Sequence, residues 1–239
     1  MKRALVTGGS GDIGAAICRA LAAEGLHICV HGHRRMERAR AVVDSIAAKG
    51  GSAEVVAFDV TDYAQTTAAL NGLLEAGPIQ VLVNNAGLHD DAPLAGMTAE
   101  QWHRVIDVSL HGFFHVTQPL LLPMIRTRWG RIISVTSISG LIGNRGQVNY
   151  AAAKAAVHGA TKALALELAS RGITVNAVAP GLMSTPDTLA LFDQESIARL
   201  VPMKRAGEPS EVASLVAYLA SDAASFISGQ IISANGAMA

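Results

Sequence analysis

Hydrophobic and polar residues follow two alternating periods along this chain. Short apolar runs rich in Val and Ile are separated by longer stretches in which apolar residues recur at helical spacing. The apolar runs predict seven strands, at residues 3–7, 28–31, 53–58, 81–83, 132–136, 173–177 and 231–233. Because strands that alternate with helices usually form a parallel sheet, we expect an α/β fold in which one doubly wound sheet is flanked by helices.

The chemically distinctive residues follow the ends of these strands. In a doubly wound sheet, ligands bind beyond the carboxyl ends of the strands. Ordinary turn residues would be expected equally at both strand ends. The sequence therefore predicts a binding site at this edge of the sheet, marked by Gly8, His31 to Arg35, Asp59, Asn85, Ser137 and Pro180.

A glycine-rich turn follows the first strand and precedes an apolar-periodic helix that runs through Leu21. Glycines let the backbone turn tightly and let a pyrophosphate approach the positive end of the helix. A strand, turn and helix of this kind are typical of a Rossmann-type dinucleotide site. The turn consists of Gly8, Gly9, Ser10, Gly11, Asp12, Ile13 and Gly14.

Tyr150 and Lys154 are four residues apart in a predicted helix over residues 149–169, so they share one face. A cation about 4 Å from a phenolate, at an effective dielectric near 20, contributes roughly 4 kcal/mol, or about 3 pK units. We therefore expect the pKa of Tyr150 to be lowered towards neutrality, with Ser137 holding the substrate oxygen. This is the chemistry of a carbonyl reductase, although the pattern alone also fits a surface tyrosine and lysine.

These patterns, together with Asn84-Asn85-Ala86-Gly87, Asp59-Val60 and Pro180-Gly181, resemble the short-chain dehydrogenase/reductase family over nearly the whole chain. Within the family, the segments 143–150, 171–176 and 178–181 are most similar to β-ketoacyl-acyl-carrier-protein reductases. The resemblance implies that Ser137, Tyr150 and Lys154 are catalytic.

The resemblance also implies how the cofactor is held. Asp59 binds the adenine amino group and Val60 flanks the ring, whereas Lys154 also holds the nicotinamide ribose. The remaining implied contacts line the ribose and diphosphate path and the nicotinamide pocket, and they are Asn85, Ala86, Gly87, Pro180, Gly181 and Met183.

The choice of cofactor depends on the end of the second strand. NAD enzymes of this type place a carboxylate there, where it accepts a hydrogen bond from the ribose 2′-hydroxyl. This chain instead has His33, Arg34 and Arg35, which offer cationic partners to a 2′-phosphate. We predict NADPH as the cofactor; the alternative is that the arginines only solvate the start of the next helix.

Two positions depart from the family pattern. Asp12 stands where the family usually has glycine and could repel a pyrophosphate, but it also suits a helix start, where it can point away. Ser109 stands where the family usually has an asparagine that supports a water-linked proton path to the lysine. A hydroxyl can hold a water but lacks the amide's reach and second donor, so a reduced or rerouted proton supply is expected.

The predicted reaction is hydride transfer from NADPH to C3 of a 3-oxoacyl thioester, with Tyr150 as the proton donor. Ser139 is either a second pocket hydroxyl or a turn residue, and Gln147 is a candidate substrate contact. Arg128 and Arg171 match positions with which such reductases bind an acidic acyl carrier protein. The alternative for these two, and for Arg126 and Arg131 of the same basic cluster, is an ordinary solvated loop, whereas Trp129 is either a contact or simply packing.

Composition narrows the class of protein further. The chain has 239 residues, half of them hydrophobic, and no Pro/Ser-rich linker, which predicts a single domain over residues 1–239. A net charge of zero gives no reason to expect nucleic acid or an anionic membrane as partner, and we expect a cytoplasmic protein. Cys18 and Cys29 are read as buried thiols, and the pair His111 and His115 lacks a third metal ligand at characteristic spacing.

The long apolar helices predicted at residues 105–125 and 148–168 have more hydrophobic surface than one sheet face covers, so a homotetramer is expected. Three alternatives remain open: a ketoreductase of polyene or polyketide chains, a small secondary-alcohol dehydrogenase, and a cofactor-binding subunit without catalytic activity. The last is suggested by Asp12 and Ser109, whereas the presence of the Ser137, Tyr150 and Lys154 set argues against it.

Overall fold

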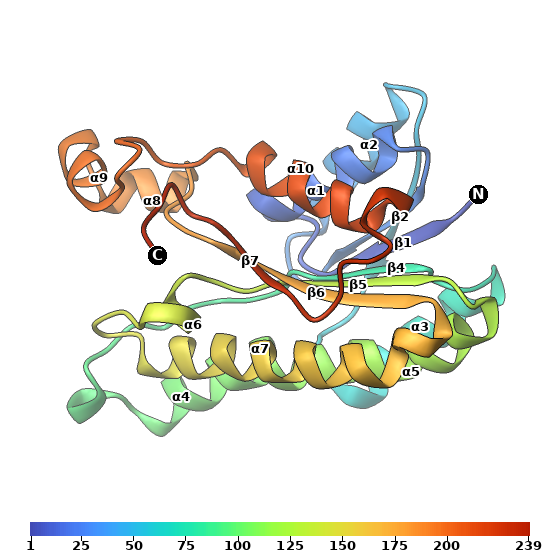
Figure 1. The fold of residues 1–239 in the computed structure, drawn as a ribbon, viewed down its shortest axis with the longest axis horizontal. Coiled ribbons are helices and arrows are strands. Elements are labelled where there is room, and N and C mark those ends of the chain that lie inside the picture. The colour runs from blue at the N-terminus through green and yellow to red at the C-terminus, as the bar shows by residue number, and fades with distance from the viewer.

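A computed structural model describes residues 1–239, which form one parallel sheet of seven strands covered by helices on both faces (Figure 1). The strand order is β3-β2-β1-β4-β5-β6-β7, so the order reverses between β1 and β4 and leaves a crevice at their carboxyl ends. This confirms the predicted fold class. The strands are β1 (Arg3–Val6), β2 (His27–Gly32), β3 (Ser52–Ala57), β4 (Val81–Asn84), β5 (Gly130–Val135), β6 (Ile173–Pro180) and β7 (Ile231–Ala234).

The long helices form two layers, one above and one below the sheet in Figure 1. One layer contains α1 (Asp12–Ala23), α2 (Met36–Ala47) and α10 (Pro209–Ala220), and the other α3 (Tyr63–Glu75), α4 (Ala99–Ile106), α5 (Gly112–Thr127) and α7 (Val148–Leu168). Shorter helices follow β5 and β6 beyond the sheet: α6 (Ser139–Ile142), α8 (Pro186–Leu191) and α9 (Gln194–Leu200). Four single turns complete the chain: η1 (Leu94–Gly96), η2 (Asp107–His111), η3 (Ala169–Arg171) and η4 (Asp222–Ala224).

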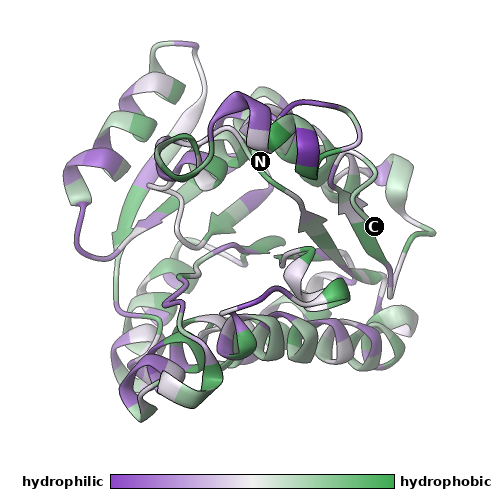
Figure 2. Ribbon diagram, turned by 90° about the vertical axis from the view of Figure 1, so that its left-hand side faces the viewer, coloured by the Kyte–Doolittle hydropathy of each residue, from purple (hydrophilic) through white to green (hydrophobic).

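The core is divided by the sheet because successive strand residues point to opposite faces. In β1, Ala4 and Val6 pack with α1 and α10, whereas Leu5 packs on the opposite face with residues of α3 and α5. Figure 2 shows hydrophobic strands in the middle and helices of mixed hydropathy outside them. This burial holds the strand ends, and the turns after them, in fixed positions.

Several elements differ in their bounds from those expected, and two of the differences change where particular residues are placed. The helix expected over residues 105–125 is interrupted, because the π-helical turn η2 joins α4 to α5. Strand β5 begins at Gly130, earlier than expected, which places Arg131 inside the sheet with 2 % of its surface exposed. The guanidinium of Arg131 donates to backbone carbonyls and pairs with Asp222, so the solvated-loop reading was wrong for this residue.

No helix in the structure combines the length and the apolar character that crossing a bilayer requires.

Candidate active site

The three predicted catalytic residues meet at the carboxyl end of β5. Tyr150 and Lys154 lie on the first turns of α7, and the Lys154 ammonium is 5.4 Å from the centre of the Tyr150 ring. Lys154 is 5 % exposed, and its Nζ donates to the carbonyl oxygen of Val135 at 3.1 Å, two residues before Ser137. The helical spacing therefore brings the phenol, the ammonium and the serine together as expected.

The pKa of Tyr150 does not follow the prediction. Burial raises the pKa of Tyr150, the Asp91 carboxylate raises it further, and the Ser137 side chain acts in the opposite direction. Lys154 is not among the groups that lower the pKa of Tyr150; its ammonium lies 5.4 Å from the ring centre and donates to the Val135 carbonyl. Burial also lowers the pKa of Lys154 to about 8. Desolvation thus shifts the pKa of each group in the direction that favours its neutral form, in place of the attraction that the sequence predicted.

The segment after β5 is tied to the start of α7 by side-chain hydrogen bonds. The Ser137 Oγ accepts from the backbone N–H of Ser139 at 3.1 Å, and the Ser139 hydroxyl donates to Gln147 at 3.0 Å. Gln147 in turn donates to Asp91 at 2.8 Å, on the loop after β4. Ser139 and Gln147 therefore lie with the predicted catalytic residues, and Ser139 begins a short helix rather than a simple turn.

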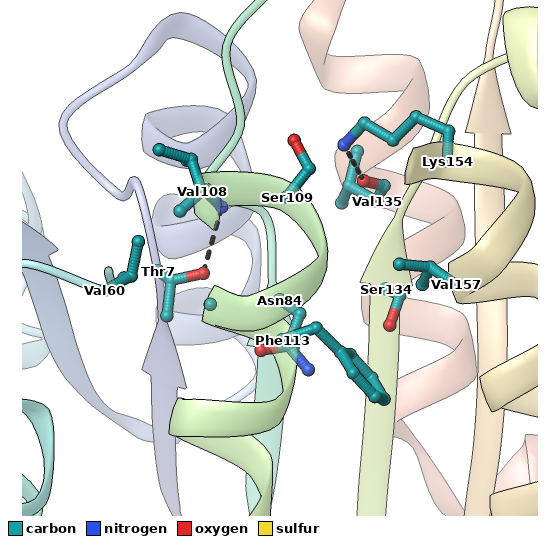
Figure 3. A pocket seen from close by; sticks show the side chains of 12 residues that line it. Thr7, Val60, Asn84, Val108, Ser109, Phe113, Ser134, Val135, Lys154 and Val157 are labelled. Carbon is teal, nitrogen blue, oxygen red and sulfur yellow. Dashed lines mark hydrogen bonds between the residues drawn. The ribbon is translucent and has the colours of Figure 1, made fainter. Parts of the chain in front are cut away.

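Ser109 lies in the π-helical turn η2, opposite Lys154 (Figure 3). A cavity of about 10 Å³, close to the volume needed for one water molecule, is lined by Ser109, Ser134 and Lys154 among others. The hydroxyls of Ser109 and Ser134 are buried and have no hydrogen-bond partner in the chain. A Cβ atom added at Gly87 would lie 3.1 Å from the Lys154 Nζ, so glycine leaves the ammonium accessible there.

The glycine-rich turn has the shape of a phosphate cradle. Gly8 adopts a φ of 62°, which favours glycine, and a Cβ atom at Gly14 would lie 2.2 Å from the Gly8 carbonyl oxygen. The side-chain amide of Asn85 donates to the carbonyls of Thr7 and Gly8 at 2.9 and 3.1 Å. Asn85 thus supports the turn itself, and the backbone at the start of α1 fits a pyrophosphate.

Asp12 is the first residue of α1, and its carboxylate accepts a hydrogen bond from Arg38 on α2 at 2.9 Å. This ion pair neutralises the charge that had suggested repulsion of the cofactor. Sequence reasoning missed Arg38, because 26 residues separate the two partners and no local signal joins them. The expectation that Asp12 is harmless to the turn thereby gains a physical reason.

The end of β2 carries the residues expected to select the cofactor. His33, Arg34 and Arg35 are exposed, and the two arginines have no ion-pair partner in the chain. His33 lies 3.6 Å from the carboxylate of Asp59. Burial alone would raise the pKa of Asp59, but hydrogen bonds from Thr61 and the charges of His33 and Arg34 outweigh burial and lower it.

The residues expected at the nicotinamide end follow β6. Pro180 is the last residue of β6, and a Cβ atom at Gly181 would lie 2.8 Å from Asn235, so the chain passes closely there. Met183 is 6 % exposed and lines a cavity of about 320 Å³ between the segment after β6, α10 and the C-terminal segment. Val60, expected beside the adenine ring, is buried at 5 % exposure.

Arg128 and Arg171 are not brought together with the predicted catalytic residues. Both are exposed and precede β5 and β6, at the amino edge of the sheet, and Ser137 lies at the opposite end of β5. Six strand residues separate these edges by roughly 20 Å. Arg128 contacts the carbonyl of Ser170 next to Arg171, so the two arginines are neighbours on that surface. Trp129 packs between Lys2 and Arg131 as part of the same edge.

Two groups of potential metal ligands contain histidine. His111 pairs with Asp107 at 2.8 Å and His115 contacts the carbonyl of Val60 at 2.8 Å, so each histidine already has a partner. A second group was missed from the sequence: His27, Cys29 and Glu54 place potential ligand atoms within 4.8 Å of one another. The Arg3 guanidinium pairs with Glu54 at 3.0 Å, and burial raises the pKa of Cys29 to about 12, which suits a hydrogen-bonded cluster better than a metal centre.

Comparison with known proteins agrees with this geometry. Residues 2–196 match the family model described as short chain dehydrogenase. The chain is similar to the 3-oxoacyl-[acyl-carrier-protein] reductase FabG of Aggregatibacter actinomycetemcomitans, with 44 % identity over 98 % of each chain. The protein of the same name from Staphylococcus aureus is also 44 % identical, over 99 % of this chain and 98 % of the relative. Nodulation protein G of Azospirillum brasilense is 42 % identical over the same shares. The chain therefore belongs to the short-chain dehydrogenase/reductase family of oxidoreductases.

Proposed function

We propose that this protein reduces a 3-oxoacyl thioester to the 3-hydroxyacyl thioester with NADPH, in fatty acid or related acyl-chain biosynthesis. The observation that carries the proposal is the meeting of Ser137, Tyr150 and Lys154 at the end of β5. The similar proteins named 3-oxoacyl-[acyl-carrier-protein] reductase support the substrate class, because their similarity extends over nearly the full length of the chain.

Each catalytic side chain has a role that its environment supports. When bound, the nicotinamide supplies the hydride. Tyr150 donates a proton to the substrate oxygen, and the raised pKa of this phenol keeps it protonated at neutral pH, the state that reduction requires. Ser137 holds the same oxygen by a hydrogen bond. Lys154, with a pKa of about 8, is largely cationic at pH 7 and stabilises negative charge that develops near Tyr150.

Proton resupply to Tyr150 runs through Lys154 in this proposal. Ser109 and Ser134 present unpaired hydroxyls to the small cavity that also receives the Lys154 side chain. A single water in such a polar cavity can bridge Ser109 to the ammonium. With this water, the shorter side chain of Ser109 takes the role in proton resupply that asparagine usually has in the family.

NADPH is the proposed cofactor because the end of β2 offers positive charge and no free carboxylate. The exposed guanidiniums of Arg34 and Arg35 suit a 2′-phosphate. The Asp59 carboxylate accepts a hydrogen bond from Thr61 and lies beside His33, which leaves it at the adenine side of the site.

Replacing Arg34 and Arg35 together by serine should weaken NADPH binding by about tenfold or more and leave NADH binding unchanged.

An acyl carrier protein is the proposed source of the substrate, and a homotetramer the proposed assembly. Arg128 and Arg171 form an exposed basic pair that an acidic carrier could contact, although they lie at the amino edge of the sheet. Exposed apolar side chains on α5 and α7, including Phe114, Leu122 and Leu166, favour burial against further copies of the chain.

Oxidation of NADPH with acetoacetyl thioesters of acyl carrier protein and of coenzyme A tests the reaction, with NADH measured in parallel. We expect turnover with NADPH and a higher kcat/KM on the carrier-bound thioester. Cofactor binding without turnover on any acyl length would support the silent-subunit alternative. Activity on polyene thioesters alone, or on simple secondary alcohols alone, would identify one of the other two alternatives.

A further inference from the structure

His31 lies near the carboxyl end of β2, the strand between β1 and β3. The turn after β1 contains Gly8 and has the shape of a phosphate cradle, and the turn after β3 contains Asp59, which the proposed function assigns to the adenine side of the site. Because β2 lies between β1 and β3, a residue at its carboxyl end can reach both turns. His31 is 3 % exposed, so its side chain is committed to contacts inside the protein.

Both ring nitrogens of His31 are used, one towards each turn. The backbone N–H of Gly8 donates to Nδ1 at 2.9 Å, and Nε2 lies 2.9 Å from the carbonyl oxygen of Phe58. Because a carbonyl can only accept, Nε2 carries the proton and Nδ1 is the acceptor, which defines a neutral tautomer. The imidazole also packs against the Phe58 ring, with centroids 4.1 Å apart.

Each partner belongs to a segment with little freedom of its own. Gly8 adopts a positive φ, and its carbonyl oxygen accepts a hydrogen bond from the Asn85 amide. The other polar group of its backbone is the N–H, and His31 accepts the hydrogen bond from it. A buried N–H without a partner would be costly. Phe58 immediately precedes Asp59 and Val60, so a contact that holds the Phe58 carbonyl also fixes the position of those two residues.

We propose that His31 is a positioning residue for the dinucleotide, which sets the spacing between the glycine-rich turn and the Asp59 turn. The inference rests on the proposed cofactor site, and it concerns the parts of the dinucleotide that NADPH and NADH share. Burial lowers the pKa of His31 to about 4, so the ring remains in the neutral form that both contacts need at pH 7.

Three variants separate the two contacts. His31→Leu removes both, His31→Asn keeps an acceptor near the position of Nδ1, and His31→Gln keeps a donor near the position of Nε2. The dissociation constants of NADPH and NADH are measured by fluorescence of the reduced nicotinamide, together with kcat at saturating NADPH. We expect His31→Leu to weaken both cofactors by about tenfold, with kcat within about twofold of wild type. We expect partial recovery of affinity in at least one polar variant.

His27→Leu is the matched control. His27 begins the same strand, and its ring also has two polar partners, Ser52 at 2.7 Å and Glu54 at 3.1 Å, but it lies at the amino edge of the sheet. We expect His27→Leu to lower stability without changing cofactor affinity. Equal loss of affinity in His27→Leu and His31→Leu would overturn the proposal, because general destabilisation would then explain both.

Further outcomes decide the remaining cases. Wild-type affinity in a folded His31→Leu variant overturns the proposal, as does a loss confined to NADPH, which would indicate a role at the 2′-phosphate. Should His31→Leu fail to fold, wild-type affinity in both the Asn and Gln variants overturns it. Failure of the proposed cofactor site is recognised separately, because the wild-type protein would then bind neither reduced nicotinamide.

Discussion

The crevice has a proposed cofactor end and a proposed catalytic end, which differ in how completely their polar groups are paired. At the cofactor end, Gly8, His31, Asn85 and Asp12 all have hydrogen-bond or ion-pair partners within the chain. At the catalytic end, the hydroxyls of Ser109 and Ser134 have none, and burial shifts the pKa values of nearby Tyr150 and Lys154. One end is therefore organised before any ligand binds, whereas the other keeps buried polar groups unpaired or partly desolvated.

This difference separates groups that stabilise the fold from groups that are available to the proposed reaction. Paired groups that hold turns in place stabilise the folded chain and shape a site for a rigid part of the ligand. Buried groups without full compensation destabilise the fold but are available to the reacting atoms. Removing a paired group at the cofactor end should therefore lower stability, whereas removing the desolvated charge of Lys154 at the catalytic end should raise it.

The largest effect is expected at the catalytic end, from Tyr150→Phe. Loss of the phenolic proton donor should lower kcat by about 10³-fold and leave the NADPH dissociation constant nearly unchanged, because the ring and its packing remain. Steady-state turnover and fluorescence titration measure the two quantities. Tyr218→Phe, at an exposed tyrosine of α10, is the control. Undiminished ketone reduction by Tyr150→Phe would contradict the proposed mechanism.

Lys154→Met should abolish most activity and yet stabilise the fold. A lysine whose folded pKa lies near 8 rather than 10.5 destabilises the folded state while it is charged. That penalty is complete below pH 8 and disappears as the pH rises towards 10.5. The variant also loses the hydrogen bond to Val135, which cancels part of the gain from removing the penalty. We therefore expect the free energy of unfolding to rise by about 2 kcal/mol at pH 7.

Urea unfolding of Lys154→Met at pH 7 and pH 10 measures this gain, which should shrink at the higher pH. Lys162→Met, at an exposed lysine two turns further along α7, should change stability little at either pH. A destabilised Lys154→Met variant would show that the ammonium contributes to the fold, and the contrast between the two ends would fail.

At the cofactor end, acid should weaken the fold through His31. The unfolded chain binds a proton at this histidine near pH 6.5, whereas the folded chain, with its pKa of about 4, does not until the pH is much lower. His33 and Asp59 are the charged groups near it. Stability should therefore fall as the pH drops below 6.5, with a loss of about 2 kcal/mol at pH 5 from this group.

Urea unfolding of wild type and His31→Asn at pH 7 and pH 5 checks this expectation. The variant should lose less stability between the two pH values, while His103→Asn, at an exposed histidine of α4, should behave as wild type. An identical pH dependence in wild type and His31→Asn would show that His31 is not the group responsible.

The smallest effect is expected at the shared cavity. Ser109→Ala and Ser134→Ala each remove a buried hydroxyl that has no partner, so stability should remain within about 0.5 kcal/mol of wild type. If Ser109 supports proton resupply, kcat should fall about threefold in Ser109→Ala and remain unchanged in Ser134→Ala. Equal rates in the two variants would remove Ser109 from the proposed path.

The sequence by itself determined the parallel sheet and the relation of Tyr150 to Lys154. Both follow from local periodicity: apolar runs separated by helical patterns require a parallel sheet with covered faces, and a spacing of four residues places two side chains on one face of a helix. Family resemblance then indicated which turns carry chemistry, and the glycine-rich turn and Ser137 lie at those strand ends.

Only the tertiary structure decided how the polar groups are paired. The partners of Asp12 and His31 are 23 to 27 residues away in the chain, and the burial of Arg131 follows from the register of β5 beside β4 and β6. The pKa of Tyr150 was mispredicted for the same reason. A helical spacing gives the distance between two charges, but the solvation of each group depends on what packs around it, and distant segments of the chain supply those atoms.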